Sequence, residues 1–116
     1  MRPRFQADED LNQKIVVGLR RREPGVDFRD AYQGGIIGLV DTEVLRNTAT
    51  SGRILISHDR RTMPAHFARF LASGSSPGLV VVPQELDIGT AIEDLLLIWS
   101  ASEAAEWRDS IGYLPL

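Results

Sequence analysis

Short apolar segments alternate along this chain with segments of helical periodicity, and this alternation constrains the fold more than any other feature. Ile54–Ser57 is rich in β-branched residues and is bounded by turn signals. Residues 79–82 are entirely apolar, as expected of a strand at the centre of a sheet. Strands that alternate with helices form βαβ units with parallel strands. We therefore expect an α/β protein, a three-layer α/β/α sandwich around a central, mainly parallel sheet.

The remaining elements follow from periodicity and from the usual signals for helix starts and stops. Strands are predicted at 5–7, 26–29, 54–57 and 79–82, with an edge strand or a docked tail at 113–116. Helices are predicted at 11–22, 43–50, 64–72 and 89–99, the last one restarting or continuing from 102 to about 109. Asp8 or Asp10 is expected to cap the first helix, and Asp41 or Thr42 the second. Residues 33–38 are glycine-rich and are expected to form a loop.

Composition limits the kind of protein that this chain can be. A length of 116 residues with 43% hydrophobic content predicts a single domain, 1–116, with a real core. The absence of cysteine excludes disulfides and thiolate metal sites, and two histidines are too few for a typical zinc site. A net charge of −3 argues against a chain that coats nucleic acid. Because no signal peptide or membrane-spanning run is visible, we expect a cytoplasmic location.

Acidic residues stand at the ends of two predicted strands, and this is the best functional clue in the sequence. Asp8 follows the first strand, Asp59 follows the strand 54–57, and Asp41 and Glu43 open the helix between them. Because the carboxyl ends of parallel strands meet at one edge of a sheet, these acids are expected to share one pocket. Carboxylates packed together repel one another, so they need a cation or a proton to coexist.

A pocket of carboxylates suits Mg²⁺ or Mn²⁺ rather than zinc, and such a centre can orient a water for attack on a phosphodiester. Ser57 is then expected to hydrogen-bond the metal-bound water, and Arg60 and Arg61 to hold a nucleic-acid backbone beside the acids. Each residue also has a purely structural explanation. Acids are common at helix starts and turns, strand-end hydroxyls bond to backbone, and arginines are often solvated. His58 is predicted to support the site rather than to ligate a metal.

Several short motifs together resemble a known family. They are Asp8-Glu9-Asp10, the run GRILISHD at 52–59 with Thr62-Met63, the run IGTAIEDLLLI at 88–98, Glu106-Trp107, and YLPL at 113–116. On these motifs the chain resembles the bacterial PIN-like proteins of domain-of-unknown-function family 5615, over essentially its whole length.

The resemblance implies a PIN-like fold and a Mg²⁺- or Mn²⁺-dependent ribonuclease, often the toxin of a toxin–antitoxin pair. It places the metal ligands at Asp8, Asp41, Glu43 and Asp59, and it implies an RNA substrate, a cognate antitoxin and a homodimer. Many relatives carry a further aspartate two residues after the last ligand, where this chain has Arg61. With Arg61 at that position, three alternatives stay open. The protein binds one metal, it binds two with Asp10 or Asp94 as a substitute ligand, or it is inactive.

Three functional hypotheses remain. The first is a metal-dependent endoribonuclease in which Asp8, Glu43, Asp59 and Ser57 carry the catalysis. The second, motivated by Arg61, is a catalytically inactive PIN-like module that binds RNA or a protein partner. The third is a receiver-like phosphorylation switch, which also places acids after its first and third strands. Receivers need a lysine after the last strand, but the only lysine here, Lys14, lies in the first predicted helix.

Overall fold

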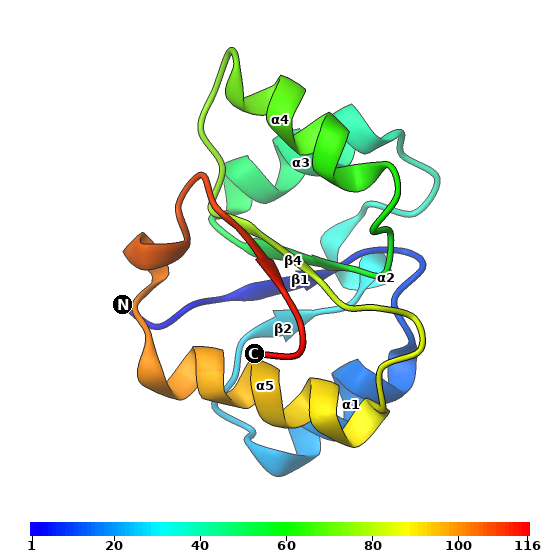
Figure 1. The fold of residues 1–116 in the computed structure, drawn as a ribbon, viewed down its shortest axis with the longest axis vertical. Helices are drawn as coiled ribbons and strands as arrows, with labels where there is room; N and C mark the ends of the chain where they lie inside the picture. Colours follow the sequence, from blue (N-terminus) through cyan, green and yellow to red (C-terminus); the bar gives the residue numbers. More distant parts are fainter.

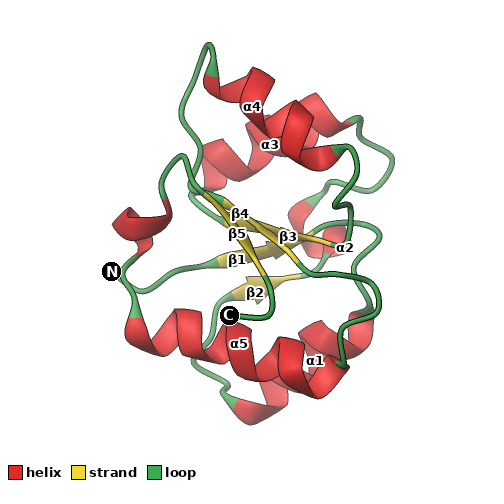
Figure 2. Cartoon of the chain, viewed as in Figure 1, coloured by secondary structure: helices red, strands yellow, loops and turns green.

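The computed structural model describes residues 1–116 and shows one parallel sheet with helices on both faces (Figures 1 and 2). The strands are β1 (Phe5–Ala7), β2 (Phe28–Arg29), β3 (Ile54–Ser57), β4 (Leu79–Val81) and β5 (Ile111–Tyr113). The helices are α1 (Gln13–Arg22), α2 (Ala31–Gly34), α3 (Asp41–Ser51), α4 (Met63–Leu71) and α5 (Ile88–Ala101), followed by the 3-10 helix η1 (Ala104–Trp107). No helix has both the length and the apolar character that crossing a membrane requires.

The five strands are all parallel and lie in the order β2-β1-β3-β4-β5. The chain therefore runs outward from β1 to β2 and then returns across β1 to form β3. In a doubly wound sheet this reversal leaves a crevice beyond the carboxyl ends of β1 and β3, where ligands usually bind. The predicted α/β class with a central parallel sheet is confirmed.

Residues of β3 alternate between the two faces of the sheet, and this alternation separates two cores. Ile54 and Ile56 belong to the cluster that includes Leu19 of α1 and residues of α5. Leu55 points the other way, into the cluster that includes Phe67 of α4 and residues of α3. Figure 1 accordingly shows α1 and α5 on one side of the sheet and α3 and α4 on the other. All four residues of β3 are almost completely buried, as expected of a strand covered on both faces.

The helix caps differ from the prediction. Asn12, not Asp8 or Asp10, caps α1, because its side-chain oxygen accepts a 2.9 Å hydrogen bond from the amide of Lys14. Helix α3 begins at Asp41, and the residue at its cap position, Val40, makes no side-chain hydrogen bond. The predicted capping roles of the acids are therefore wrong, and Asp8 and Asp10 lie before the first helix rather than at its start.

Other boundaries also move. The segment predicted as a loop at 33–38 begins inside α2. The N-terminus of α2 is capped by a reciprocal capping box between Asp30 and Gln33. Strand β2 is shorter than the predicted strand 26–29, and β5 lies at 111–113 instead of 113–116. Helix α5 ends at Ala101, and the residues after it form η1 rather than a continuing α-helix.

Candidate active site

A hollow with a volume of about 370 Å³ lies at the carboxyl ends of β1 and β3, and we call it the acid pocket. Its lining residues are Asp8, Glu9, Asp10, Leu39, Asp41 and Asp59. The structure thus brings together three of the four predicted metal ligands. The fourth, Glu43, is exposed on α3 and does not line the acid pocket. Among the additional acids, Asp10 lines it, whereas Asp94 accepts a hydrogen bond from the backbone amide of Leu116.

Asp8 follows β1 directly and is only partly exposed. One carboxylate oxygen accepts a 2.9 Å hydrogen bond from the amide of Glu9, and the other accepts a 2.7 Å bond from the Ser57 hydroxyl group. Burial raises the pKa of Asp8 to about 6, more than these hydrogen bonds lower it, and the neighbouring charges of Asp10 and Asp41 add to the rise. The ionised Asp8 therefore lacks a compensating positive charge.

Ser57 is completely buried at the end of β3 and connects two of the acids. Its hydroxyl group donates to Asp8 and accepts a 3.0 Å hydrogen bond from the amide of Asp59. A serine hydroxyl has a single proton to donate. In this arrangement the proton goes to Asp8, so Ser57 orients a carboxylate and does not donate to a water.

Asp59 holds the turn between β3 and α4. One of its carboxylate oxygens accepts hydrogen bonds from the amides of Arg61 (3.1 Å) and Thr62 (2.8 Å), and the other accepts from the Thr62 hydroxyl group. Burial raises the pKa of Asp59, but these hydrogen bonds outweigh it and hold the pKa below its ordinary value. Asp59 is therefore ionised, has the structural role of a turn residue, and still lines the acid pocket.

The remaining two aspartates of the acid pocket differ in their partners. Asp41 pairs with His66 of α4, at 3.0 Å between the carboxylate and the ring nitrogen Nε2. Burial raises the pKa of Asp10, and a hydrogen bond from the His58 backbone opposes the rise. Asp10 and Asp8 thus both carry charge that burial disfavours.

His58 uses both ring nitrogens within the protein. Nδ1 lies 2.8 Å from the carbonyl oxygen of Val82, and Nε2 accepts a 3.2 Å hydrogen bond from the amide of Asn12. Because a carbonyl only accepts and an amide N–H only donates, Nδ1 carries the proton and the imidazole is neutral. His58 therefore connects the ends of β3 and β4 to the start of α1, in agreement with the predicted supporting role.

Arg60 and Arg61 lie in the turn after Asp59 and line a second, more open hollow of about 570 Å³ that also includes Asp10 and Asp59. Arg60 forms an exposed ion pair with Glu85, with 3.4 Å between nitrogen and oxygen. The Arg61 side chain is exposed and forms no ion pair. The predicted phosphate-binding arginines are thus beside the acids, although one of them is already paired.

The donor set of the acid pocket fits a hydrated Mg²⁺ or Mn²⁺ ion in its chemistry. All its charged groups are carboxylates, and only Asp41 among them contacts a basic side chain, that of His66. Mg²⁺ keeps several waters and needs only one or two carboxylates. No three carboxylates or imidazoles of the chain lie close enough to hold an ion together as they stand. Binding through more than two of these acids therefore requires side-chain movement.

Glu9 and His66 belong to this region and were not identified from the sequence. Glu9 accepts a 2.9 Å hydrogen bond from the amide of Gly38 and so ties the segment before α3 to the end of β1. The only sequence signal for Glu9 is its place between two aspartates. No sequence signal indicated that His66 would pair with Asp41, because the two residues lie on different helices.

Fold and site together define the class: a doubly wound α/β protein with a carboxylate pocket at its topological switch point. A scan against protein-family models, a search of curated proteins and a search of solved structures found no match to this chain. The resemblance to PIN-like proteins therefore stays a prediction from the sequence.

Proposed function

We propose that this protein is a Mg²⁺- or Mn²⁺-dependent endoribonuclease that hydrolyses RNA phosphodiesters at the acid pocket. The observation that carries the proposal is the uncompensated charge of Asp8. This carboxylate is desolvated among four other acids at a ligand-binding edge of the sheet, and its pKa is raised to about 6. A divalent cation relieves such a repulsion. The family resemblance adds support.

In this proposal Asp8 and Asp59 are the principal metal ligands, with Asp41 as a third. When bound, the metal would polarise a phosphoryl oxygen and lower the pKa of a bound water. Ser57 holds Asp8 at a set position and Thr62 does the same for Asp59, so both carboxylates are oriented before any ligand arrives.

The other predicted residues have supporting parts in the proposal. Arg60 and Arg61 bind phosphate at the edge of the acid pocket, where Arg60 exchanges Glu85 for the RNA backbone. Glu43 contributes only if its side chain turns toward Asp41. We place the activity in the cytoplasm, with a cognate antitoxin and a homodimer as the expected partners.

Cleavage of a labelled single-stranded RNA tests the proposal. The wild-type protein should cleave with Mn²⁺ or Mg²⁺ and stop with EDTA, whereas Asp59→Ala should be inactive. Because Asp59 also holds a turn, Asp8→Asn serves as a second inactive variant whose amide oxygen still accepts from Ser57. Glu93→Gln, an exposed acid on α5, is the matched control and should cleave normally. Equal cleavage by wild type and both aspartate variants would identify a contaminating nuclease and remove the proposal.

A catalytically inactive module that binds RNA or a protein partner is the second candidate. Two observations favour it: no three potential ligands lie together, and Arg61 stands where relatives are expected to carry an acid. Calorimetric titration with Mn²⁺ separates the candidates, because metal binding that Asp8→Ala abolishes supports the enzyme and absent binding supports the module. The receiver-like switch shares the strand order, but Lys14 lies on α1 and no lysine follows the last strand.

A further inference from the structure

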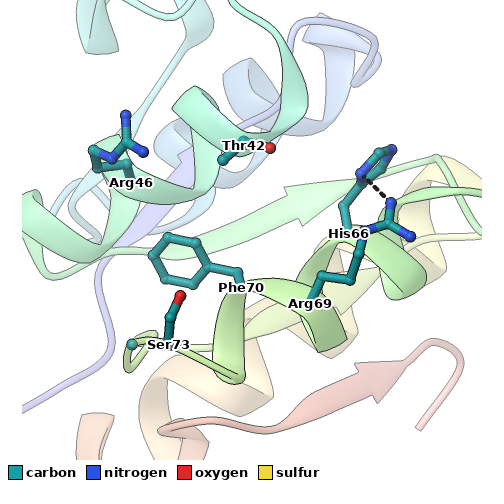
Figure 3. A pocket seen from close by; sticks show the side chains of 7 residues that line it. Thr42, Arg46, His66, Arg69, Phe70 and Ser73 are labelled. Atoms are coloured by element: carbon teal, nitrogen blue, oxygen red, sulfur yellow. Dashed lines mark hydrogen bonds between the residues drawn. The ribbon is translucent and has the colours of Figure 1, made fainter.

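A groove between α3 and α4 has a character opposite to that of the acid pocket, and we call it the basic groove. It has a volume of about 450 Å³, and its lining residues are Thr42, Arg46, His66, Arg69, Phe70, Ser73 and Gly74. No carboxylate lines it, and Phe70 is its only apolar side chain. Figure 3 shows Arg46 and Thr42 on α3 and the side chains of His66, Arg69 and Phe70 on α4.

The positive charge of the basic groove is not neutralised within the protein. Arg46 forms no ion pair, and Arg69 donates only to Nδ1 of His66, at 2.9 Å. Arg22 and Arg53, by contrast, are each paired with a carboxylate. Although the chain as a whole carries a net charge of −3, two guanidinium groups without a carboxylate partner in one hollow attract anions locally.

The arrangement of these groups suits a polymer of phosphates better than one small anion. In Figure 3 the guanidinium groups of Arg46 and Arg69 lie on opposite sides of the view, and the Phe70 ring lies on the side of Arg46. Arginine forks bind phosphate oxygens, and the hydroxyl groups of Thr42 and Ser73 add donors. An aromatic ring in a groove with phosphate-binding groups is a usual platform for stacking an unpaired base, and Phe70 lines this groove.

The basic groove and the acid pocket meet at one hydrogen-bonded pair of side chains. Asp41 lines the acid pocket, His66 lines the basic groove, and their side chains touch at 3.0 Å. Arg69 donates to Nδ1 of His66, so Nε2 carries the proton toward Asp41. A nucleic-acid strand bound in the basic groove would therefore reach the acids by crossing the Asp41–His66 pair.

We propose that the basic groove binds the phosphate backbone of single-stranded RNA on one side of the acid pocket, through Arg46 and Arg69. This inference rests on the proposed ribonuclease function, because it assigns the groove to the same substrate. The Asp41–His66 pair marks the boundary between backbone binding and the acids.

Fluorescence anisotropy with a labelled single-stranded RNA of mixed sequence tests the proposal in EDTA, where binding is measured without cleavage. The double variant Arg46→Ala/Arg69→Ala should raise the dissociation constant about tenfold and lower the salt slope by about 1.4, because each lost contact with a single strand removes about 0.7. Arg21→Ala is the matched control. Arg21 is exposed, unpaired and lies on α1, on the other side of the sheet, so this change should have little effect.

A second measurement follows the groove directly. The chain has only two histidines, so the ring protons of His66 and His58 are easily distinguished by NMR. Added RNA should shift the His66 signals of the wild type and of Arg21→Ala, and should leave those of the double variant nearly unchanged.

The remaining outcomes overturn the inference or separate it from the ribonuclease proposal. Unchanged RNA binding by the double variant, equal weakening by Arg21→Ala, or no binding by wild type would overturn it. Polyglutamate serves as a second probe, in place of an acidic protein partner. If the double variant loses polyglutamate binding but keeps RNA binding, the groove binds an acidic protein and the inference is overturned. If wild type cleaves RNA with Mn²⁺ while the double variant binds normally, only the groove assignment fails. If the double variant loses binding and wild type never cleaves, the ribonuclease fails and the RNA groove stands.

Discussion

The Ser57 hydroxyl group, at the end of β3, donates a 2.7 Å hydrogen bond to the carboxylate of Asp8, at the end of β1. The same oxygen accepts from the amide of Asp59, so one buried side chain joins both strand ends and the turn that follows. Ser57→Ala should reduce the free energy of unfolding by about 1–3 kcal/mol, because it leaves buried polar groups without a partner. It should also raise the pKa of Asp8 further, since this hydrogen bond lowers that pKa.

Urea denaturation measures the cost of Ser57→Ala. Ser100→Ala is the control, because Ser100 is exposed on α5 and its hydroxyl group makes only a 3.4 Å bond to the carbonyl oxygen of Leu97. That change should alter stability by less than about 0.5 kcal/mol. Equal costs for the two variants would contradict the importance of the link between β1 and β3.

Asp8 should make the protein less stable as the pH rises. Its pKa is about 6 in the folded protein and 3.8 as the reference for an unfolded chain. The folded state therefore binds the proton more tightly, and its stability is highest below about pH 4, falls as the pH rises through 6, and is level above that. Neutralisation by Asp8→Asn should raise the free energy of unfolding by about 1–2 kcal/mol at pH 7, after allowance for solvent screening.

Denaturation of wild type and Asp8→Asn at pH 7 and pH 4 checks this prediction. The gain in stability should be present at pH 7 and nearly absent at pH 4, where Asp8 is already protonated. A gain of the same size at both pH values would show that packing, not charge, causes it. A more stable variant that is also inactive would fit a functional site held at a cost in stability.

Arg53 and Asp27 form the best-defined ion pair in the structure. Both terminal nitrogens of Arg53 bond the Asp27 carboxylate, at 2.7 and 3.1 Å, and one also donates to the carbonyl oxygen of Phe5. Lysine cannot make these parallel bonds. Arg53→Lys should therefore cost about 1–3 kcal/mol in the free energy of unfolding. Arg22→Lys changes an exposed pair with Glu93 and should cost close to nothing, and thermal unfolding of both variants compares them.

Gly78 precedes β4 and has a backbone φ of 128°, which favours glycine. A Cβ atom at this position would lie 2.5 Å from the carbonyl oxygen of Trp107, a backbone atom with little room to move. Gly78→Ala should therefore cost about 2–4 kcal/mol in the free energy of unfolding, from strain and overlap together.

Gly38→Ala separates the two causes. Gly38 has a φ of 79°, but a Cβ atom there would meet nothing within 4 Å. The change should cost only the conformational part, about 1 kcal/mol. If guanidinium denaturation gives the same cost for both variants, the overlap at Gly78 is not important.

Local sequence was sufficient for the elements with the strongest composition signals. Ile54–Ser57 was predicted with its observed bounds, because β-branched residues between two turn signals favour only a strand. The cap of α1 was predicted wrongly, because three residues with capping side chains precede the helix at alternate positions, namely Asp8, Asp10 and Asn12. Which of them caps depends on the path that the chain takes after β1, and propensity carries no information on that path.

The candidate site shows the same division. Asp8 and Asp59 follow parallel strands, so their meeting in the acid pocket was predictable from topology alone. Asp41 and Glu43 are two positions apart on a helix, which turns them to different sides of α3. Only the packing of α3 on the sheet decides that Asp41 lines the acid pocket and Glu43 faces solvent.

The sequence by itself determined the class of fold and the edge of the sheet at which the acids gather, because hydrophobic periodicity and strand order are local and topological properties. The tertiary structure alone decided the partners of these acids. Asp41 meets His66, and Asp8 meets Ser57, across separations of 25 and 49 residues that no local pattern encodes. Burial at these contacts sets the raised pKa of Asp8, because desolvation depends on what packs around a carboxylate and not on its neighbours in the chain.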